Sequence, residues 1–355
     1  MGGFAGEDGI IRAHADSFVR VQPREWRRAD RENGGVVNLT PGATREFGAG
    51  RREREEEPDE YRTCFERDRD RILHSSAFRR LSGKTQVFVF PEDHMRTRLT
   101  HALEVAQVAT SVARATGLNV TLTEAIALGH DCGHGPGGHA SEDALEIYLP
   151  DGFDHASFGA DVALAPLNLC AETLDGVRQH SWSRPAPSTP EGEVVSWADR
   201  IAYVCHDFED ALGAGVVRSD DLPRVVRERC GDSRAGQLRY FIRALIATIS
   251  STGVVGMAPE PATTLAEFRD FNYRTIYMRD ASTLQARRVV DMLRALVEYY
   301  EHHPQRLPSD HVDSPGGTLA AAVGYVAGMT DRFACRAAVE LLDWPLDQLP
   351  NGIDR

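Results

Sequence analysis

Two neighbouring stretches decide the fold: residues 98–117 read RLTHALEVAQVATSVARATG, and residues 121–131 read TLTEAIALGHD. In the first stretch, apolar residues recur with the spacing of one face of an α-helix. Gly117 closes it, and glycine is the favoured residue just past a helix end. In the second stretch, Thr121 and Glu124 have the spacing of a capping box ahead of an apolar run. Both stretches therefore predict helices, and the second ends on a His-Asp doublet.

Helical spacing continues along the chain, whereas alternating β patterns are confined to short pieces such as KTQVFVF (84–90). We therefore predict an all-α fold, a helical core with additional helices and a few short β pieces. Further helices are expected at about residues 65–81, 141–149, 158–178, 194–213, 221–229, 235–250, 283–301 and 317–343.

The composition is that of a soluble globular protein: 355 residues, 42% hydrophobic and 26% charged. The net charge of −13 repels nucleic acids and anionic membranes at long range, so a bound polyanion needs a local basic or metal-bearing site. The six cysteines show no paired spacing, and neither a signal sequence nor a long apolar run is present. These features predict a cytoplasmic protein with reduced thiols and no membrane partner. Lys84 is the single lysine among 40 Lys and Arg residues.

The first 58 residues differ in character from the rest of the chain. They are rich in Arg, Glu and Gly, contain the charge block RREREEE (51–57), and lack a sustained hydrophobic period. We therefore predict a flexible N-terminal arm over residues 1–58. The folded part is expected at 59–345, with a core at about 95–215 and a C-terminal helical part at about 216–345, before a tail at 346–355.

The densest group of reactive side chains lies in HDCGHGPGGHASE (130–142). A single histidine on a helix is usually a hydrogen-bonded structural residue. Here, however, five ligands or acid–base groups fall within thirteen residues. An imidazole and a carboxylate at the end of a buried helix are costly unless something compensates them, and a divalent metal ion does so. The cluster therefore predicts metal binding or catalysis.

A second group lies in SWADRIAYVCHDFEDAL (196–212). Asp199, Tyr203 and Asp207 recur at i, i+4 and i+8 and so share one helix face. This face is either a solvated acidic stripe or part of a site, and the apolar residues around it favour burial. A buried Asp199 requires a cation. His101 lies within the apolar period of its own helix, one turn after Arg98.

The order of an isolated His, a His-Asp doublet and a distant Asp resembles the HD-domain metal-dependent phosphohydrolases. The surrounding residues resemble the dGTP triphosphohydrolase branch, from about residue 61 to 343. Five blocks carry this resemblance: DRDRILHSSAFRRLSGKTQVF (68–88), RTRLTHALEVAQ (96–107), HDCGHGPGGH (130–139), WADRIAYVCHDFEDAL (197–212) and YVAGMTDRFA (325–334). The order and spacing of these blocks are specific, whereas an HD doublet alone is a weak signal.

The resemblance implies roles for individual residues. The implied metal ligands are His101, His130, Asp131 and Asp199. The implied catalytic residues are the pair His139 and Glu142, with His134 on the phosphates and His155 near the α-phosphate. The implied substrate contacts are Tyr203 and Asp207 at the deoxyribose, with Arg98, Arg200, Lys84 and Gln86 at phosphate and sugar.

The resemblance also implies an activity: hydrolysis of dGTP or several dNTPs to deoxynucleoside and inorganic triphosphate. Two His and two Asp suit a divalent ion such as Mn²⁺, Mg²⁺, Co²⁺, Ni²⁺ or Fe²⁺. Further implied partners are an allosteric dNTP, single-stranded DNA and other copies of the chain in a hexamer or tetramer. The chain departs from the family at GPGG (135–138), where the family has two prolines and an aromatic residue. This departure puts the rigidity of the loop in question.

Two other functions fit parts of the same pattern. One is an HD-domain phosphohydrolase acting on another nucleotide or phosphate ester, which would share the metal ligands. The other is a catalytically silent, nucleotide-sensing or DNA-binding oligomer, which predicts loss of a ligand or of the His–Glu pair, and none is missing. A P-loop at SGKT (82–85) is excluded because its spacing requires Gly at position 78, which is Phe78.

Overall fold

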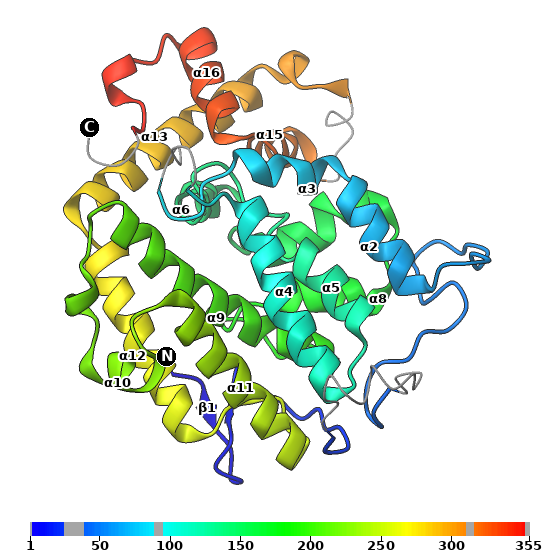
Figure 1. Ribbon diagram of the computed structural model, residues 1–355. Coiled ribbons are helices and arrows are strands. Elements are labelled where there is room, and N and C mark those ends of the chain that lie inside the picture. Colours follow the sequence, from blue (N-terminus) through cyan, green and yellow to red (C-terminus); the bar gives the residue numbers. More distant parts are fainter. Residues whose placement is uncertain (1, 25–38, 89–94, 310–315, 352–355) are drawn as a thin grey trace. The chain divides into compact units, whose positions relative to one another are not determined.

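A computed structural model describes residues 2–24, 39–88, 95–309 and 316–351 (Figure 1). Helices dominate these residues, which confirms the all-α prediction. The only sheet in the described ranges pairs two antiparallel strands, β1 (Phe4–Ala5) and β2 (Ile11–Arg12). Of the β piece expected at 84–90, the described residues contain one isolated bridge, between Thr85 and Thr97, and residues 89–90 lie outside the described ranges.

The chain forms two compact units, each assembled from three segments. Unit 1 comprises Met1–His74, Ala102–His130 and Leu167–Ile276, and unit 2 comprises Ser75–His101, Asp131–Pro166 and Tyr277–Arg355. This division does not follow the expected boundary near residue 215. Within unit 1, α9 (Pro190–Gly213) packs against α11 (Arg234–Thr252) and α12 (Pro259–Asn272), which come from the other side of that boundary.

The core of unit 1 is built around α5 (Val120–Gly129), which packs against α2 (Cys64–His74), α8 (Ala171–Gln179) and α9. Its cap is Asn119, whose side chain accepts a hydrogen bond from the Leu122 amide at 3.0 Å. The capping box expected at Thr121 was therefore wrong by two residues. Asn is as good a cap as Thr, and it lies where the chain enters the helix.

Gly176 allows α5 and α8 to pack closely against each other. A Cβ at Gly176 of α8 would lie 2.4 Å from Cδ1 of Ile126 on α5, so a larger residue would push the two helices apart. Ile126 is completely buried. This contact fixes α5 from one side, and α5 leads directly into the His-Asp doublet.

Unit 2 is built around α13 (Asp280–His302), which packs against α6 (Ala140–Leu145), α15 (Gly317–Ala327) and α16 (Asp331–Leu342). The buried residues of these four helices form one hydrophobic cluster. The single helix expected at 317–343 is therefore two helices. The chain leaves α15 at Gly328, and Thr330 begins the next helix.

Several other helices complete the two units. They are α3 (Ser76–Arg80), α4 (Arg98–Thr116), α7 (His155–Phe158) and α10 (Arg224–Cys230). The helix expected at 158–178 is interrupted between α7 and α8 by a π-helical turn, Gly159–Ala163, and a 3₁₀ turn, Ala165–Leu167. The sequence analysis missed α12, because Pro259 and Pro261 stand in its first turn and weaken the helical pattern.

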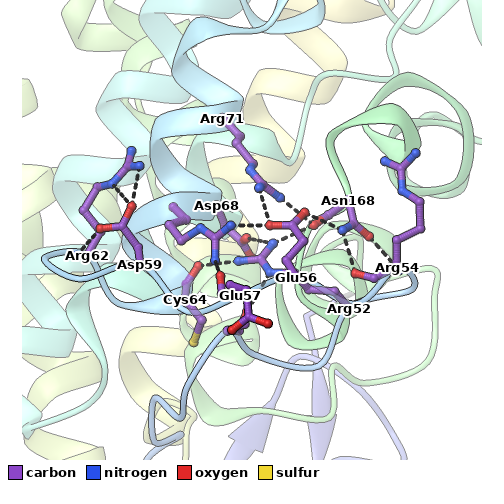
Figure 2. A network of polar contacts seen from close by, with 12 residues as sticks. Arg52, Arg54, Glu56, Glu57, Asp59, Arg62, Cys64, Asp68, Arg71 and Asn168 are labelled. Carbon is purple, nitrogen blue, oxygen red and sulfur yellow. Dashed lines mark hydrogen bonds and ion pairs between the residues drawn. The ribbon is translucent and has the colours of Figure 1, made fainter.

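The charge block at 51–57 belongs to a polar network within unit 1 (Figure 2). Nη1 of Arg52 lies 2.7 Å from Oδ1 of Asp68 on α2, and the two side chains are 1% and 0% exposed. Glu56 binds Arg71 at 2.6 Å. The expectation of a flexible, solvated arm was therefore wrong for this block. Its buried cation is paired with a carboxylate from α2, a partner that local composition does not reveal.

We expect Arg52→Met to lower the free energy of unfolding by about 3 kcal/mol or more, because it leaves the Asp68 carboxylate buried without its cation. The matched control is Arg51→Met. Arg51 pairs with Glu172 at 2.8 Å but is 77% exposed, so its loss should cost about 1 kcal/mol or less. Urea unfolding of the two variants measures the difference. Equal effects would show that the buried pair does not stabilise unit 1.

Candidate metal centre and catalytic histidines

His130 of unit 1 has the environment of a metal ligand. It follows α5 directly and is completely buried. Its Nδ1 lies 2.6 Å from the carbonyl oxygen of Ala127, and because a carbonyl only accepts, this nitrogen carries the proton. In the neutral imidazole this leaves Nε2 as the nitrogen that can bind a metal, the arrangement of metal-binding histidines whose other nitrogen donates to a backbone carbonyl. Nε2 lies 3.7 Å from Oδ1 of Asp199.

Asp199 lies on α9, which Thr189 caps through a hydrogen bond to the Gly192 amide. Most of the helix around it is buried, which confirms the expectation for this stretch, and the Asp199 side chain is 22% exposed. Tyr203 and Asp207 follow at one and two turns, on the same face. Asp207 is buried, whereas Tyr203 is partly exposed.

In unit 2 the Asp131 carboxylate is surrounded by basic side chains. Arg98 donates to Oδ2 at 2.6 Å, and Nε2 of His134 lies 3.2 Å from Oδ1. Nε2 of His101 lies 4.0 Å from Oδ2, and Nε2 of His155 lies 4.0 Å from Oδ1. All five side chains are at least nine-tenths buried. The carboxylate is therefore surrounded by basic side chains rather than by solvent.

The spacing of these groups fits a divalent metal ion. The His130–Asp199 and His101–Asp131 separations, 3.7 and 4.0 Å, are too long for hydrogen bonds. Two ligand atoms on one ion, with bonds of about 2.0–2.2 Å, lie roughly 3–4 Å apart. Each unit thus contains one His–carboxylate pair of metal-ligand type, and the peptide bond between His130 and Asp131 joins the two pairs.

Four side chains of unit 2 form a second cluster around Glu142, which lies in the first turn of α6. Its Oε2 is 3.3 Å from Nδ1 of His139, and its Oε1 accepts hydrogen bonds from both the backbone amide and Nδ1 of His155. The rings of His134 and His155 stack with centroids 3.7 Å apart. One carboxylate therefore orients two imidazoles, and the second imidazole packs against a third.

The members of this cluster differ in the direction of their pKa shifts. Burial alone would raise the pKa of Glu142, but the hydrogen bonds from His139 and His155 hold it well below its usual range. Burial would lower the pKa of His155, and Glu142 raises it above the ordinary value instead. Burial, together with the charges of Arg98 and His155, lowers the pKa of His134 well below the usual range. The cluster therefore holds a carboxylate and a neutral His134 at neutral pH.

His139 differs from the other members by its exposure. Its side chain is 75% exposed, whereas His134 and His155 are buried. An imidazole that is oriented by a carboxylate and open to an incoming molecule is suited to general acid–base chemistry. The i, i+3 spacing of His139 and Glu142 already places them on one side of a helical turn.

The expected substrate contacts have different environments. In unit 1, the hydroxyl of Tyr203 accepts a hydrogen bond from Nε of Arg269 at 3.0 Å. The guanidinium carbon of Arg200 lies 3.3 Å from the centroid of the Trp182 ring, a close cation–π contact. In unit 2, Oε1 of Gln86 is buried without a hydrogen-bond partner among the described residues.

Lys84 does not have the environment of a phosphate-binding residue. It is 2% exposed, and its ammonium donates to the backbone carbonyls of His134 and, at 3.0 Å, of Ala327. Burial lowers its pKa to about 8. In this structure the lysine binds backbone carbonyls inside unit 2, and its contact with phosphate stays a prediction.

The sequence analysis missed His180, which caps the end of α8 in unit 1. Its Nδ1 lies 2.8 Å from the carbonyl oxygen of Val177, and its ring meets that of His130 edge-on at 5.0 Å. Both histidines follow the last residue of a helix and contact the carbonyl three residues earlier. That shared position was the available signal, and it was missed because His180 lies outside the histidine-rich window.

None of the described helices combines the length and apolar character that a membrane span needs.

Two protein families match the chain: the HD domain over residues 98–204 and the phosphohydrolase-associated domain over residues 255–340. A deoxyguanosinetriphosphate triphosphohydrolase-like protein of Caldanaerobacter subterraneus is 40% identical over 305 residues, 83% of this chain and 90% of the relative. One of Clostridium perfringens is 40% identical over 79% of this chain and 87% of the relative. One of Syntrophus aciditrophicus is 36% identical over 83% and 91%.

A solved structure of a hypothetical protein from Aquifex aeolicus covers 79% of this chain and 69% of its own, with a TM-score of 0.49 and 17% identity, a likeness too low to inform the function. The sequence relatives are much closer, and they match the chain across both families. The chain therefore belongs to the deoxyguanosinetriphosphate triphosphohydrolase-like family of HD-domain proteins and is a metal-dependent phosphohydrolase.

Proposed function

We propose that the protein hydrolyses deoxynucleoside triphosphates to deoxynucleoside and inorganic triphosphate. The observation that carries the proposal is the Glu142 cluster, in which one ionised carboxylate holds His139 and His155 while His139 stays open to a ligand. The relatives carry the name of such an activity on deoxyguanosine triphosphate. A catalytically silent, nucleotide-sensing protein would not require an oriented, exposed imidazole beside a metal site.

The residues that would hold the metal are His101, His130, Asp131 and Asp199. Two imidazoles and two carboxylates suit Mn²⁺, Mg²⁺, Co²⁺, Ni²⁺ or Fe²⁺. Such an ion supplies positive charge that screens the α-phosphate and activates water. Arg98, 2.6 Å from Oδ2 of Asp131, holds this carboxylate in place for that role.

The reaction breaks the bond between the α-phosphorus and the 5′-oxygen, and the oxygen of water takes its place. His139, oriented by Glu142, handles the proton at the attacking water or at the leaving 5′-oxygen. His134 has a depressed pKa and so presents a neutral imidazole to the phosphates, whereas His155 next to Glu142 favours the protonated form and attracts the α-phosphate.

Tyr203 and Asp207 are proposed to bind the deoxyribose, since both follow Asp199 on one face of α9. The hydrogen bond from Arg269 holds the Tyr203 ring in place, and a positioned ring discriminates against a 2′-hydroxyl by shape. Arg98, Arg200 and Gln86 are proposed contacts to phosphate and sugar. A cytoplasmic location, a hexamer or tetramer, an activating dNTP and a single-stranded DNA effector stay predictions of the family resemblance.

The product decides the reaction class. We expect the metal-loaded protein to convert at least one dNTP to deoxynucleoside and an equal amount of inorganic triphosphate, separated by ion-exchange chromatography. Orthophosphate or pyrophosphate as the product would contradict the proposal. Release of orthophosphate from another phosphate ester, with no dNTP turnover, would favour the alternative HD-domain activity.

The proposed ligands are tested by metal content. We expect Asp199→Ala to lose the metal that the wild-type protein retains after dialysis, as measured by inductively coupled plasma mass spectrometry, because one of the four ligands is gone. Glu209→Ala on the same helix is the control, since Glu209 pairs with Arg234 on the surface. Full metal occupancy in Asp199→Ala would remove this residue from the ligand set.

The proposed role of His139 is tested separately. We expect His139→Ala to retain the metal and lose turnover by roughly 10²–10⁴-fold in kcat, the usual contribution of general acid–base catalysis. Steady-state kinetics together with metal analysis measure both quantities. A normal kcat would show that His139 transfers no proton in the reaction.

A further inference from the structure

The loop between His134 and His139 has little rigidity of its own. Gly137 and Gly138 both adopt left-handed backbone conformations, with φ of +75° and +65°, which glycine reaches easily. Between His134 and His139 the loop reads GPGG (135–138), with one proline and no aromatic residue. If the loop holds His134 and His139 in place, the support must come from residues outside it.

Asp331, in the first turn of α16, supplies one part of that support. Its Oδ1 accepts the Gly137 amide at 2.9 Å, and its Oδ2 accepts the amide of Thr85 at 2.9 Å and also the Thr85 hydroxyl. Asp331 is 4% exposed. A single buried carboxylate therefore joins α16, the segment after α3 and the glycine loop, all within unit 2.

Lys84 supplies the second part. Its ammonium binds the carbonyl of His134, where the loop begins, and the carbonyl of Ala327, at the end of α15. Asp331 opposes the lowering of the Lys84 pKa by burial, so the two charges stabilise each other. Lysine rather than arginine suits this position, because a compact ammonium with three donors fits between two carbonyls where a planar guanidinium fork does not.

The packing leaves no room for a side chain at either glycine. A Cβ at Gly137 would lie 2.5 Å from Cγ1 of Val289 on α13, and a Cβ at Gly138 would lie 2.9 Å from Nη2 of Arg98. Ser141 donates its hydroxyl to the Gly138 carbonyl at 2.6 Å and accepts the Gly135 amide at 3.1 Å. The loop is therefore held at both ends and in its middle.

We propose that Lys84 and Asp331 are positioning residues for the catalytic histidines, and that the phosphohydrolase-associated domain contributes to catalysis by supplying Asp331. The inference rests on the proposed function, because it takes His134 and His139 to be the groups that act on the substrate. It gives a role to one residue in each of two sequence blocks, Lys84 in KTQVF (84–88) and Asp331 in YVAGMTDRFA (325–334). Asp331 lies within the residues matched by the associated domain, and the loop lies within the HD domain match.

The test uses two near-isosteric variants in the full-length, metal-loaded protein. Asp331→Asn replaces an acceptor with an amide donor that faces the N–H of Gly137 or Thr85, and Lys84→Met removes all donors at nearly the same length. We expect each to lower kcat for a dNTP by roughly 10- to 100-fold, with KM and metal content close to those of the wild type. Small displacements of positioned groups have effects of that size.

The matched control is Arg80→Ala. Arg80 links the same two segments on the surface, through a 3.0 Å hydrogen bond to the Gly328 carbonyl, and does not contact the loop. If Lys84 and Asp331 only stabilise unit 2, all three variants should lower Tm and leave the kcat of the folded protein unchanged. A kcat within about twofold of the wild type in both Asp331→Asn and Lys84→Met would overturn the proposal.

A second measurement does not depend on turnover. Amide hydrogen exchange, followed by mass spectrometry of peptides covering residues 134–141, should be faster by about tenfold or more in Asp331→Asn and unchanged in Arg80→Ala. Unchanged exchange in Asp331→Asn would overturn the positioning role. If the wild-type protein releases no triphosphate from any dNTP, the proposed function fails by itself, and the exchange experiment alone decides whether Lys84 and Asp331 hold the loop.

Discussion

A carboxylate shut away from water must be met by positive charge or by hydrogen-bond donors, and Asp131 is 3% exposed. Arg98 meets it at 2.6 Å, and His134 and His101 face it from the loop and from the first turn of α4. Much of the site follows from this requirement. Arg98 is buried where it pairs with Asp131. Its charge also helps to lower the pKa of His134.

The same principle recurs at three other places. Asp68 pairs with Arg52 inside unit 1, Glu142 binds two histidines, and Asp331 and Lys84 each bind backbone groups of the glycine loop. In each case at least one partner of the buried charge comes from a different segment of the chain. Buried carboxylates thus hold basic side chains in place. Part of the acidic excess behind the net charge of −13 therefore positions Arg, Lys and His side chains.

The glycine loop is held by residues that lie outside it. A loop with prolines limits its own backbone, whereas Gly135–Gly138 depends on Asp331, Lys84 and Ser141. Those contacts come from residues on both sides of the loop in sequence. Parts of both matches, residues 98–101 and 131–166 of the HD domain and residues 277–340 of the associated domain, lie in unit 2, and neither match alone contains every group that holds the histidines.

The local features of the site were predictable. The apolar run of α5 followed by a His-Asp doublet indicated metal binding or catalysis, and the family resemblance implied that Glu142 orients His139. Other features were not: Glu142 also binds His155, thirteen residues away, and the charge block at 51–57 is partly buried. Composition describes the average environment of a segment, and it does not say which single residue finds a buried partner.

By itself, the sequence determined the helices, the ligand types and the family, because helical periodicity and short-range spacing are properties of neighbouring residues. Only the tertiary structure decided what each buried charge contacts. Lys84 could be seen in the sequence as an isolated lysine, yet its partner Ala327 lies 243 residues along the chain. The physical reason is that desolvation makes a charge depend on whatever group folding brings within hydrogen-bond distance, and that group can come from any part of the chain.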